Sequence, residues 1–142
     1  MIYDGTGNTN LLKYYATGLT TGAIYTFNLV ALNFNGASDQ STDASFTVCT
    51  SPSGLNAPTV YATTETSVSF TWTAPASNGG CSITTYALYS DFGAGGSTFS
   101  VLDSSIASKP YLRADTVTLA STYTGLTFRV YLTATNSISG TV

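Results

Sequence analysis

The stretch IYTFNLVALNFNG, residues 24–36, determines the expected fold, because its pattern returns 103 residues later in the stretch TFRVYLTATNSIS, residues 127–139. In the first copy, large or apolar side chains recur at every second position from Tyr25 to Ala31. A period of two places these side chains on one side of an extended strand, whereas a helix would scatter them around its surface. Two copies of one strand pattern in a short chain indicate tandem repeats.

The correspondence between the copies covers the turn before the strand as well as the strand itself. The matched pairs are Gly22 and Gly125, Ile24 and Thr127, Tyr25 and Phe128, Phe27 and Val130, Leu29 and Leu132, Ala31 and Ala134, and Asn33 and Asn136.

The composition predicts an all-β protein with a polar but weakly charged surface. Hydrophobic residues make up 43% of the 142 residues, which is enough for a packed core, while charged residues make up only 8%, against roughly 25% in typical soluble domains. With 26 Thr and 18 Ser, hydroxyl groups take the place of most surface charges. Thr and Tyr favour strands, and almost no segment has the period of an amphipathic helix.

The charge balance argues against two classes of partner. The net charge is −3, and the chain has only four basic residues, Lys13, Lys109, Arg113 and Arg129. Binding to nucleic acid or to an anionic membrane surface needs many more cationic contacts. No apolar run approaches the roughly 20 residues of a membrane span. We expect no nucleic-acid partner and no membrane insertion.

The predicted strands divide into two groups separated by a linker. Short strands are expected at residues 2–3, 13–17, 24–33 and 44–48. Residues 49–58 contain two prolines with Ser and Gly, and are expected to form the linker. A second set of strands is expected at residues 60–62, 68–72, 83–89, 97–102, 116–119 and 126–136. The domain prediction is therefore 1–48, a linker at 49–58, and 59–142.

In their order along the chain, these features resemble a fibronectin type III module. The residues that carry the resemblance are Pro58, Trp72, Pro75, Asn78, Gly79, Gly80, Ile83 and Tyr86, together with Leu19, Tyr25, Phe27, Ala31, Asn33 and Gly36. The resemblance implies an immunoglobulin-like sandwich of seven strands in two antiparallel sheets. Residues 1–48 would supply only the last strands of a first repeat. Residues 59–142 would form a nearly complete second repeat, whose last strand would begin at residues 141–142.

The family also implies roles for individual core residues. Trp72 would lie in the core on the second strand, and Tyr25 would form a tyrosine corner, its hydroxyl bonded to the backbone near Leu19. Phe128 replaces this tyrosine in the second copy, so that turn must be held by packing, with help from Tyr123. The full set of expected core residues is Trp72, Tyr86, Leu19, Tyr25, Phe27, Phe128 and Val130.

The two cysteines are expected to form a disulfide. In a sandwich of this topology, the start of the first strand and the loop between the second and third strands lie at the same end. Cys49 and Cys81 would therefore meet there; the alternative is two unpaired thiols. No histidine is present, so the usual structural zinc site is not expected. A disulfide would indicate an extracellular or cell-surface setting.

The leading functional hypothesis is a structural repeat of an extracellular fibre or surface filament. No Ser-His-Asp or Cys-His set exists and Glu65 is the only glutamate, so an enzyme and a cofactor are not expected. The incomplete modules would be closed either by neighbouring repeats in a longer chain or by a strand from another copy. Both arrangements give a linear, head-to-tail fibre.

Apolar residues that face outward on the two repeated strands are candidate lateral contacts: Val30, Leu32 and Tyr131. Cross-strand neighbours or glycans are the alternative cover for them. Any sugar would be O-linked, since no Asn-x-Ser/Thr sequence occurs.

The second hypothesis is an adhesion or carbohydrate-binding accessory module. Its ligand contacts would come from loops 34–39 and 137–140, with Phe34 or Phe92 as stacking residues.

Overall fold

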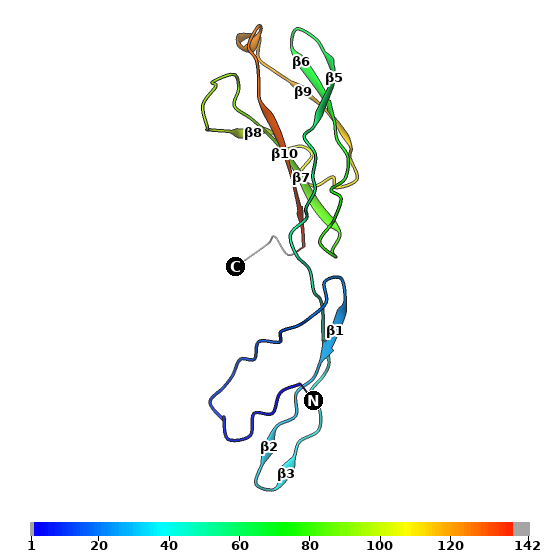
Figure 1. Ribbon diagram of the computed structural model, residues 1–142, viewed down its shortest axis with the longest axis vertical. Coiled ribbons are helices and arrows are strands. Elements are labelled where there is room, and N and C mark those ends of the chain that lie inside the picture. The colour runs from blue at the N-terminus through cyan, green and yellow to red at the C-terminus, as the bar shows by residue number, and fades with distance from the viewer. Residues whose placement is uncertain (1, 138–142) are drawn as a thin grey trace. The chain divides into compact units, whose positions relative to one another are not determined.

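The computed structural model describes residues 2–137 and divides the chain into two compact units, Met1–Val48 and Cys49–Val142. Figure 1 shows both units. Residue 1 and residues 138–142 lie outside the described residues. The predicted start of a last strand at residues 141–142, and all but the first residue of loop 137–140, therefore lie outside them too. Within residues 2–137, no helix is long and apolar enough to cross a membrane.

The first unit contains two short antiparallel ladders. Strand β1 (Ile24–Phe27) pairs with β4 (Ala44–Thr47), and β2 (Leu32–Asn33) pairs with β3 (Gly36–Ala37). The strands predicted at residues 2–3 and 13–17 are not formed, which corrects the sequence interpretation. A strand is stable only where its backbone groups are paired, and among the described residues neither segment has a partner strand.

The long strand expected from residue 24 to residue 33 is interrupted between β1 and β2. Two serines satisfy the backbone there: the Leu29 amide donates to Ser41 Oγ at 2.9 Å, and the Ala31 amide donates to Ser38 Oγ at 3.0 Å. These hydroxyl groups take the place of backbone carbonyls in the ladder. The periodicity of the sequence continues through this segment although the regular pairing does not.

The second unit is a sandwich of two three-stranded antiparallel sheets, seen as two layers in Figure 1. One sheet has the order β5-β6-β9 and consists of β5 (Thr59–Thr63), β6 (Ser67–Thr71) and β9 (Ala114–Thr118). The other has the order β10-β7-β8 and consists of β10 (Val130–Asn136), β7 (Ile83–Ser90) and β8 (Ser100–Asp103). A short 3-10 helix, Ser121–Tyr123, leads from β9 towards β10. The all-β prediction is confirmed.

The hydrophobic core lies between the two sheets of the second unit. Burial alternates along β7, as the period of two predicts. The buried core residues are Phe70, Trp72, Tyr86, Leu88, Ile106, Val117 and Leu132. By contrast, none of the described residues 2–48 is buried. The first unit therefore has strands but no core of its own.

Candidate functional site

The structure joins Cys49 to Cys81 in a disulfide, as predicted, with their Cα atoms 5.7 Å apart. The two cysteines are 32 residues apart in the chain. Closing such a loop restricts the unfolded chain and stabilises the fold by about 3.5 kcal/mol in the chain-entropy account. Cys81 lies just before β7, so the disulfide ties the beginning of the second unit to a central strand.

Hydrogen bonds extend this connection along the segment that was predicted to be a linker. The Thr50 amide donates to the Gly79 carbonyl at 2.8 Å, and Ser53 and Ser77 exchange two backbone bonds of 3.0 and 3.1 Å. Residues 49–53 therefore form part of the second unit, in which they pack as an extra extended segment. We call residues 49–53, residues 77–81 and Asn136 the linker clasp.

Asn136 completes the linker clasp from the end of β10. Its side chain is almost fully buried, and its Nδ2 donates to the carbonyl oxygens of Thr50 and Asn78, both at 2.8 Å. One amide group therefore joins three segments that are far apart in the sequence. The sequence contained a signal for this residue, because Asn136 matches Asn33 in the repeat, but the role of the asparagine was not predicted.

Gly79 is required by the close approach of the linker to the loop. Its φ of +71° lies in the left-handed region, and a Cβ atom at this position would collide with the Thr50 carbonyl oxygen. Any other residue would be strained and would push the linker away. The Asn-Gly-Gly sequence at residues 78–80, which contributed to the family resemblance, thus has a specific structural purpose.

The turn that precedes the repeated strand has the same geometry in both copies. The Ala23 amide bonds to the Thr20 carbonyl, and the Leu126 amide bonds to the Tyr123 carbonyl, both at 3.2 Å. In each turn the glycine has a positive φ, 84° at Gly22 and 81° at Gly125. The sequence repeat is therefore also a repeat of local structure.

Different side chains hold the two turns. In the first unit the Thr20 amide donates to the Tyr25 hydroxyl at 3.0 Å, beside the half-buried Leu19. In the second unit, where Phe128 has no hydroxyl, the ring of Tyr123 packs edge-on against Phe128 with 5.8 Å between centroids. Packing takes the place of the hydrogen bond there.

The structure gives the other predicted core residues different degrees of burial. Trp72 and Tyr86 are buried and pack against each other, with ring centroids 5.9 Å apart. Phe27, Phe128 and Val130 are only half-buried. Phe27 stacks on Phe46 of β4 at 5.4 Å, and Tyr25 lies 6.5 Å from Phe46, so these three rings share one face of the β1-β4 ladder.

The three candidate lateral contacts belong to different units, and all three are exposed. Val30 and Leu32 lie in the first unit and Tyr131 in the second. Tyr131 stacks on Tyr89 of the neighbouring strand with centroids 4.8 Å apart, and lies 5.0 Å from the ring of Phe99. Tyr131 is therefore partly covered by aromatic neighbours of its own unit, which was the alternative to a lateral contact with another module.

An ion pair lies beside these rings at the end of β7. Arg129 Nε donates to Asp91 Oδ2 at 2.7 Å, and the Arg129 amide donates to Asp91 Oδ1 at 2.9 Å. These bonds hold the pKa of Asp91 at about 2, well below its ordinary value. The guanidinium also lies over the ring of Phe99, 5.2 Å from its centroid. The arrangement fixes the start of β10 against β7.

The two candidate stacking residues for carbohydrate have opposite environments. Phe34 is fully exposed at the turn between β2 and β3. Phe92 is half-buried and packs against Tyr123, 5.5 Å between centroids. Only Phe34 presents a free ring to solvent.

A pair of carboxylic acids links the two sheets. Burial and the neighbouring Asp103 raise the pKa of Asp115, whereas hydrogen bonds from Ser105 help to lower the pKa of Asp103 despite partial burial. Asp115 Oδ2 is buried with no hydrogen-bond partner. Of the two carboxyl groups, Asp115 therefore has the raised pKa and Asp103 the lowered one.

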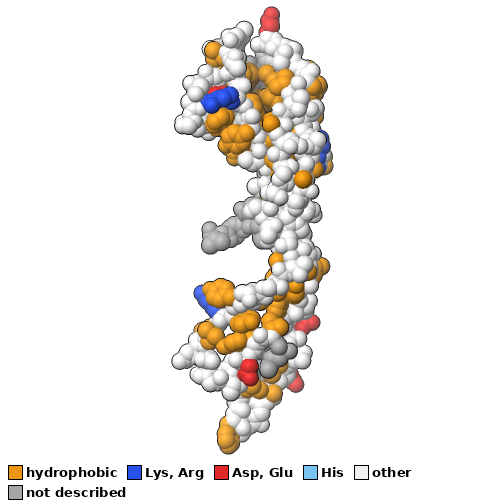
Figure 2. Space-filling model, in the orientation of Figure 1, with side chains coloured by type: hydrophobic (Ala, Val, Ile, Leu, Met, Phe, Trp, Pro, Cys, Tyr) orange, Lys and Arg blue, Asp and Glu red, His pale blue; other side chains and the backbone are white. Residues whose placement is uncertain are grey.

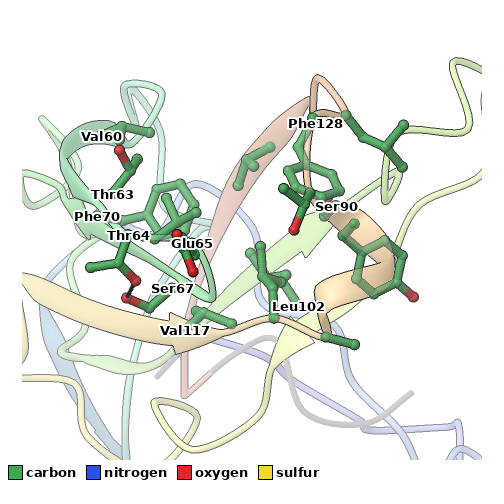
Figure 3. Close-up of a pocket in the computed structure, with 18 residues that line it drawn as sticks. Val60, Thr63, Thr64, Glu65, Ser67, Phe70, Ser90, Leu102, Val117 and Phe128 are labelled. Atoms are coloured by element: carbon green, nitrogen blue, oxygen red, sulfur yellow. Dashed lines mark hydrogen bonds between the residues drawn. The ribbon is translucent and has the colours of Figure 1, made fainter.

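A cavity of about 330 Å³ opens between the sheets of the second unit. Figure 3 shows Val60 and Phe70 of the β5-β6-β9 sheet on one side of it, and Phe128 and Ser90 on the other. Most of its remaining wall comes from β6, β9 and residues 119–126, and β10 contributes only Val130. Among residues 2–137, no strand pairs with the edge of β10 opposite β7.

No protein-family model matches the chain. Among solved structures, the chain is similar to domains A168-A170 from titin, with 23% sequence identity and a TM-score of 0.60. The fold is an immunoglobulin- or fibronectin-like β-sandwich. The match covers 80% of this chain and 35% of the titin chain, so the chain spans about a third of the structure that it resembles.

Proposed function

We propose that the chain is a structural repeat of an extracellular fibre or surface filament, in which β-sandwich modules are joined head to tail. The observation that carries this proposal is the absence of any buried side chain among the described residues 2–48. Tyr25, Phe27 and Phe46 form an aromatic cluster there on one face of a two-stranded ladder. An isolated ladder of this size is marginal in water, so its stability must come from association with other modules.

The surface chemistry supports the extracellular fibre. The disulfide between Cys49 and Cys81 is typical of proteins in oxidising compartments. Charged side chains are sparse on the face seen in Figure 2, so neighbouring modules repel each other little. The many Ser and Thr hydroxyls are acceptors for O-linked glycans, which would cover surface that does not contact a neighbouring repeat.

Electron microscopy of the protein from its natural source tests this function. We expect filaments with an axial period set by one module, and antibodies against the 142-residue chain should decorate them at that period. Dispersed particles without a period, decorated at single points, would contradict a structural repeat.

A second function, carbohydrate binding, is favoured by one observation only, the fully exposed ring of Phe34. A flat aromatic face is the usual platform for a sugar ring. A glycan array probed with the chain and with Phe34→Ala distinguishes the functions. Binding that depends on Phe34, by protein that forms no filaments, would favour the accessory module.

A further inference from the structure

The chain contains two Asn-Gly dipeptides, Asn35-Gly36 and Asn78-Gly79, and the structure holds them in opposite ways. Asparagine is chemically least stable in this dipeptide, because the backbone nitrogen of the next residue can attack the carbonyl carbon of its side chain. A glycine has no side chain to hinder that approach, and it reaches backbone conformations that other residues avoid. Whether the reaction proceeds in a folded chain therefore depends on whether the two groups are able to meet.

Asn35-Gly36 lies in the hairpin formed by β2 and β3 (Figure 1). Asn35 forms the turn together with Phe34, and Gly36 begins β3. Both Asn35 and Gly36 are exposed, and a Cβ atom added to Gly36 would meet no heavy atom within 4 Å. Among residues 2–137, the side-chain amide of Asn35 makes no hydrogen bond. No contact of this amide has to be broken before it turns towards the Gly36 nitrogen.

The ladder that contains Gly36 is also weak. Strands β2 and β3 pair only through Leu32 with Ala37 and Asn33 with Gly36, and all four residues are exposed. A short two-stranded hairpin is marginally stable in water, so local opening of this turn costs little free energy. The turn can therefore reach the geometry of attack while the second unit stays folded.

Asn78-Gly79 has the same sequence but belongs to the linker clasp. The Gly79 amide, which would be the attacking group, donates to Ser77 Oγ at 3.1 Å, and Gly79 is buried. The side chain that would be attacked is also held, because Asn78 Oδ1 accepts a hydrogen bond from the Gly80 amide at 2.9 Å. The Asn78 carbonyl oxygen accepts a third bond from Asn136 at 2.8 Å. Both reacting groups of this dipeptide are therefore fixed.

We propose that Asn35 is a site of spontaneous deamidation and that the linker clasp protects Asn78 from the same reaction. The Gly36 nitrogen forms a bond to Cγ of Asn35, and the bond from Cγ to Nδ2 breaks. Nδ2 leaves with that electron pair and with the proton that the Gly36 nitrogen gives up, as ammonia. Water then opens the resulting succinimide ring at either carbonyl group, which gives aspartate or isoaspartate. The step needs no oxidant or reductant.

The modification would change both the charge and the backbone of the first unit. Either product adds one negative charge to a chain whose net charge is −3. Isoaspartate also adds a carbon atom to the main chain before Gly36, which disturbs the pairing of β2 with β3. The exposed ring of Phe34 lies next to this site in the sequence. The inference is independent of the proposed fibre function.

Peptide mapping by mass spectrometry tests the proposal on the full chain. The protein is incubated at pH 6 and at pH 8 in water enriched in heavy oxygen, then reduced and digested with pepsin in acid, where the reaction is slow. Each new carboxyl group takes one oxygen atom from the water, and a methyltransferase specific for isoaspartate distinguishes the two products. The reaction should be faster at pH 8, because the attacking nitrogen has to lose its proton.

We expect Asn35 to react at least about tenfold faster than Asn78 in the folded chain. A tenfold difference corresponds to about 1.4 kcal/mol of opening free energy, and the linker clasp opens only when several hydrogen bonds break together. Asn8 is a control for the glycine, since it is an exposed asparagine followed by Thr9. It should react more slowly than Asn35.

Two further controls separate the effect of structure from that of sequence. In guanidinium chloride with the disulfide reduced, Asn35 and Asn78 should react at similar rates, because each is followed by glycine. The substitution Asn136→Ala removes two hydrogen bonds of the linker clasp. It should raise the rate at Asn78 at least about threefold and leave the rate at Asn35 unchanged.

The proposal is overturned if, in the folded chain, Asn35 reacts no faster than Asn8 or no faster than Asn78. It is also overturned if the rates at Asn35 and Asn78 differ as much in guanidinium chloride as in the folded chain, because the protection would then come from the neighbouring sequence. An unchanged rate at Asn78 in the Asn136→Ala variant would show that the clasp does not protect this residue. Equal rates only after unfolding would support the proposal.

Discussion

Asn136 shows how one polar side chain can organise segments that the sequence keeps apart. Its two hydrogen bonds reach the linker at Thr50 and the loop at Asn78. The Asn136 side chain is buried, and these two bonds satisfy both hydrogens of its amide group. The corresponding residue of the first copy, Asn33, is exposed and accepts a hydrogen bond from the Asn35 amide in its own turn.

The substitution Asn136→Ala should destabilise the second unit by about 1–3 kcal/mol, because it removes both hydrogen bonds made by a buried amide group. Urea unfolding followed by Trp72 fluorescence measures the change. Asn33→Ala is the matched control at the equivalent position, and should change stability by about 0.5 kcal/mol or less. Equal effects of the two substitutions would show that burial of Asn136 does not matter.

Asp91 gives the second unit an acid-dependent stability. Its pKa is about 2 in the folded state, below the ordinary value of 3.8. The stabilisation is therefore fully present above pH 4 and is lost as the pH falls from about 4 towards 2. We expect Asp91→Asn to be less stable than the natural chain at pH 6 and to lose less stability on acidification. Urea unfolding of both proteins between pH 2 and pH 6 measures the free energy of unfolding. If it falls by the same amount with pH in both proteins, Asp91 does not provide the acid-dependent stability.

The sequence predicted those features that depend on local periodicity or on the repeat. The alternation in β7, the pair Cys49 and Cys81, and the all-β class belong to this group. The contacts of Asn136 and the burial of Ile106 were not predicted, because each depends on segments far away in the chain. The strand at residues 13–17 was predicted wrongly, since strand propensity without a partner strand does not make a strand.

At the scale of elements, the linker clasp makes residues 49–53 a part of the sandwich. The disulfide, the backbone bonds to residues 77–79 and the amide of Asn136 all act on this one short segment. Proline, serine and glycine content predicted a linker at residues 49–58, but composition cannot show that the loop at residues 77–79 supplies hydrogen-bond partners. The physical linker between the units is therefore very short.

The double substitution Cys49→Ser and Cys81→Ser should lower the free energy of unfolding of the second unit by about 3.5 kcal/mol. It should also release residues 50–53, so that the Thr50 and Ser53 amides exchange hydrogen faster while those of β7 keep most of their protection. Denaturant unfolding and hydrogen exchange by NMR measure the two effects. Unchanged exchange at Thr50 would mean that the hydrogen bonds alone hold the segment.

At the scale of the whole molecule, the two units differ in how their side chains are buried. The second has seven buried hydrophobic residues between its sheets, and the described part of the first has none. Apolar burial is the main favourable term in folding. The stability of the chain is therefore concentrated after residue 48.

Hydrogen exchange followed by mass spectrometry should separate the units in the dilute monomer. We expect amides of β1 and β4 to exchange at least about 100-fold faster than those of β7, because opening the first unit exposes little apolar surface. The amides of β5, an edge strand of the second unit, provide an internal reference. Equal protection of β1 and β7 would show that the two units unfold as one.

The disulfide also decides how the second unit would respond if its ends were pulled. Tension that enters at Cys49 passes through the two sulfur atoms to Cys81, so β5 and β6 lie inside a closed covalent ring and bear no force. The segment between the two cysteines, a separation of 32 residues, cannot be extended by the force. The gain in length when the unit unfolds under force is therefore smaller by roughly 105–115 Å. A stretched filament of such modules would keep a third of each one tethered near its folded position, ready to reform when the tension ends.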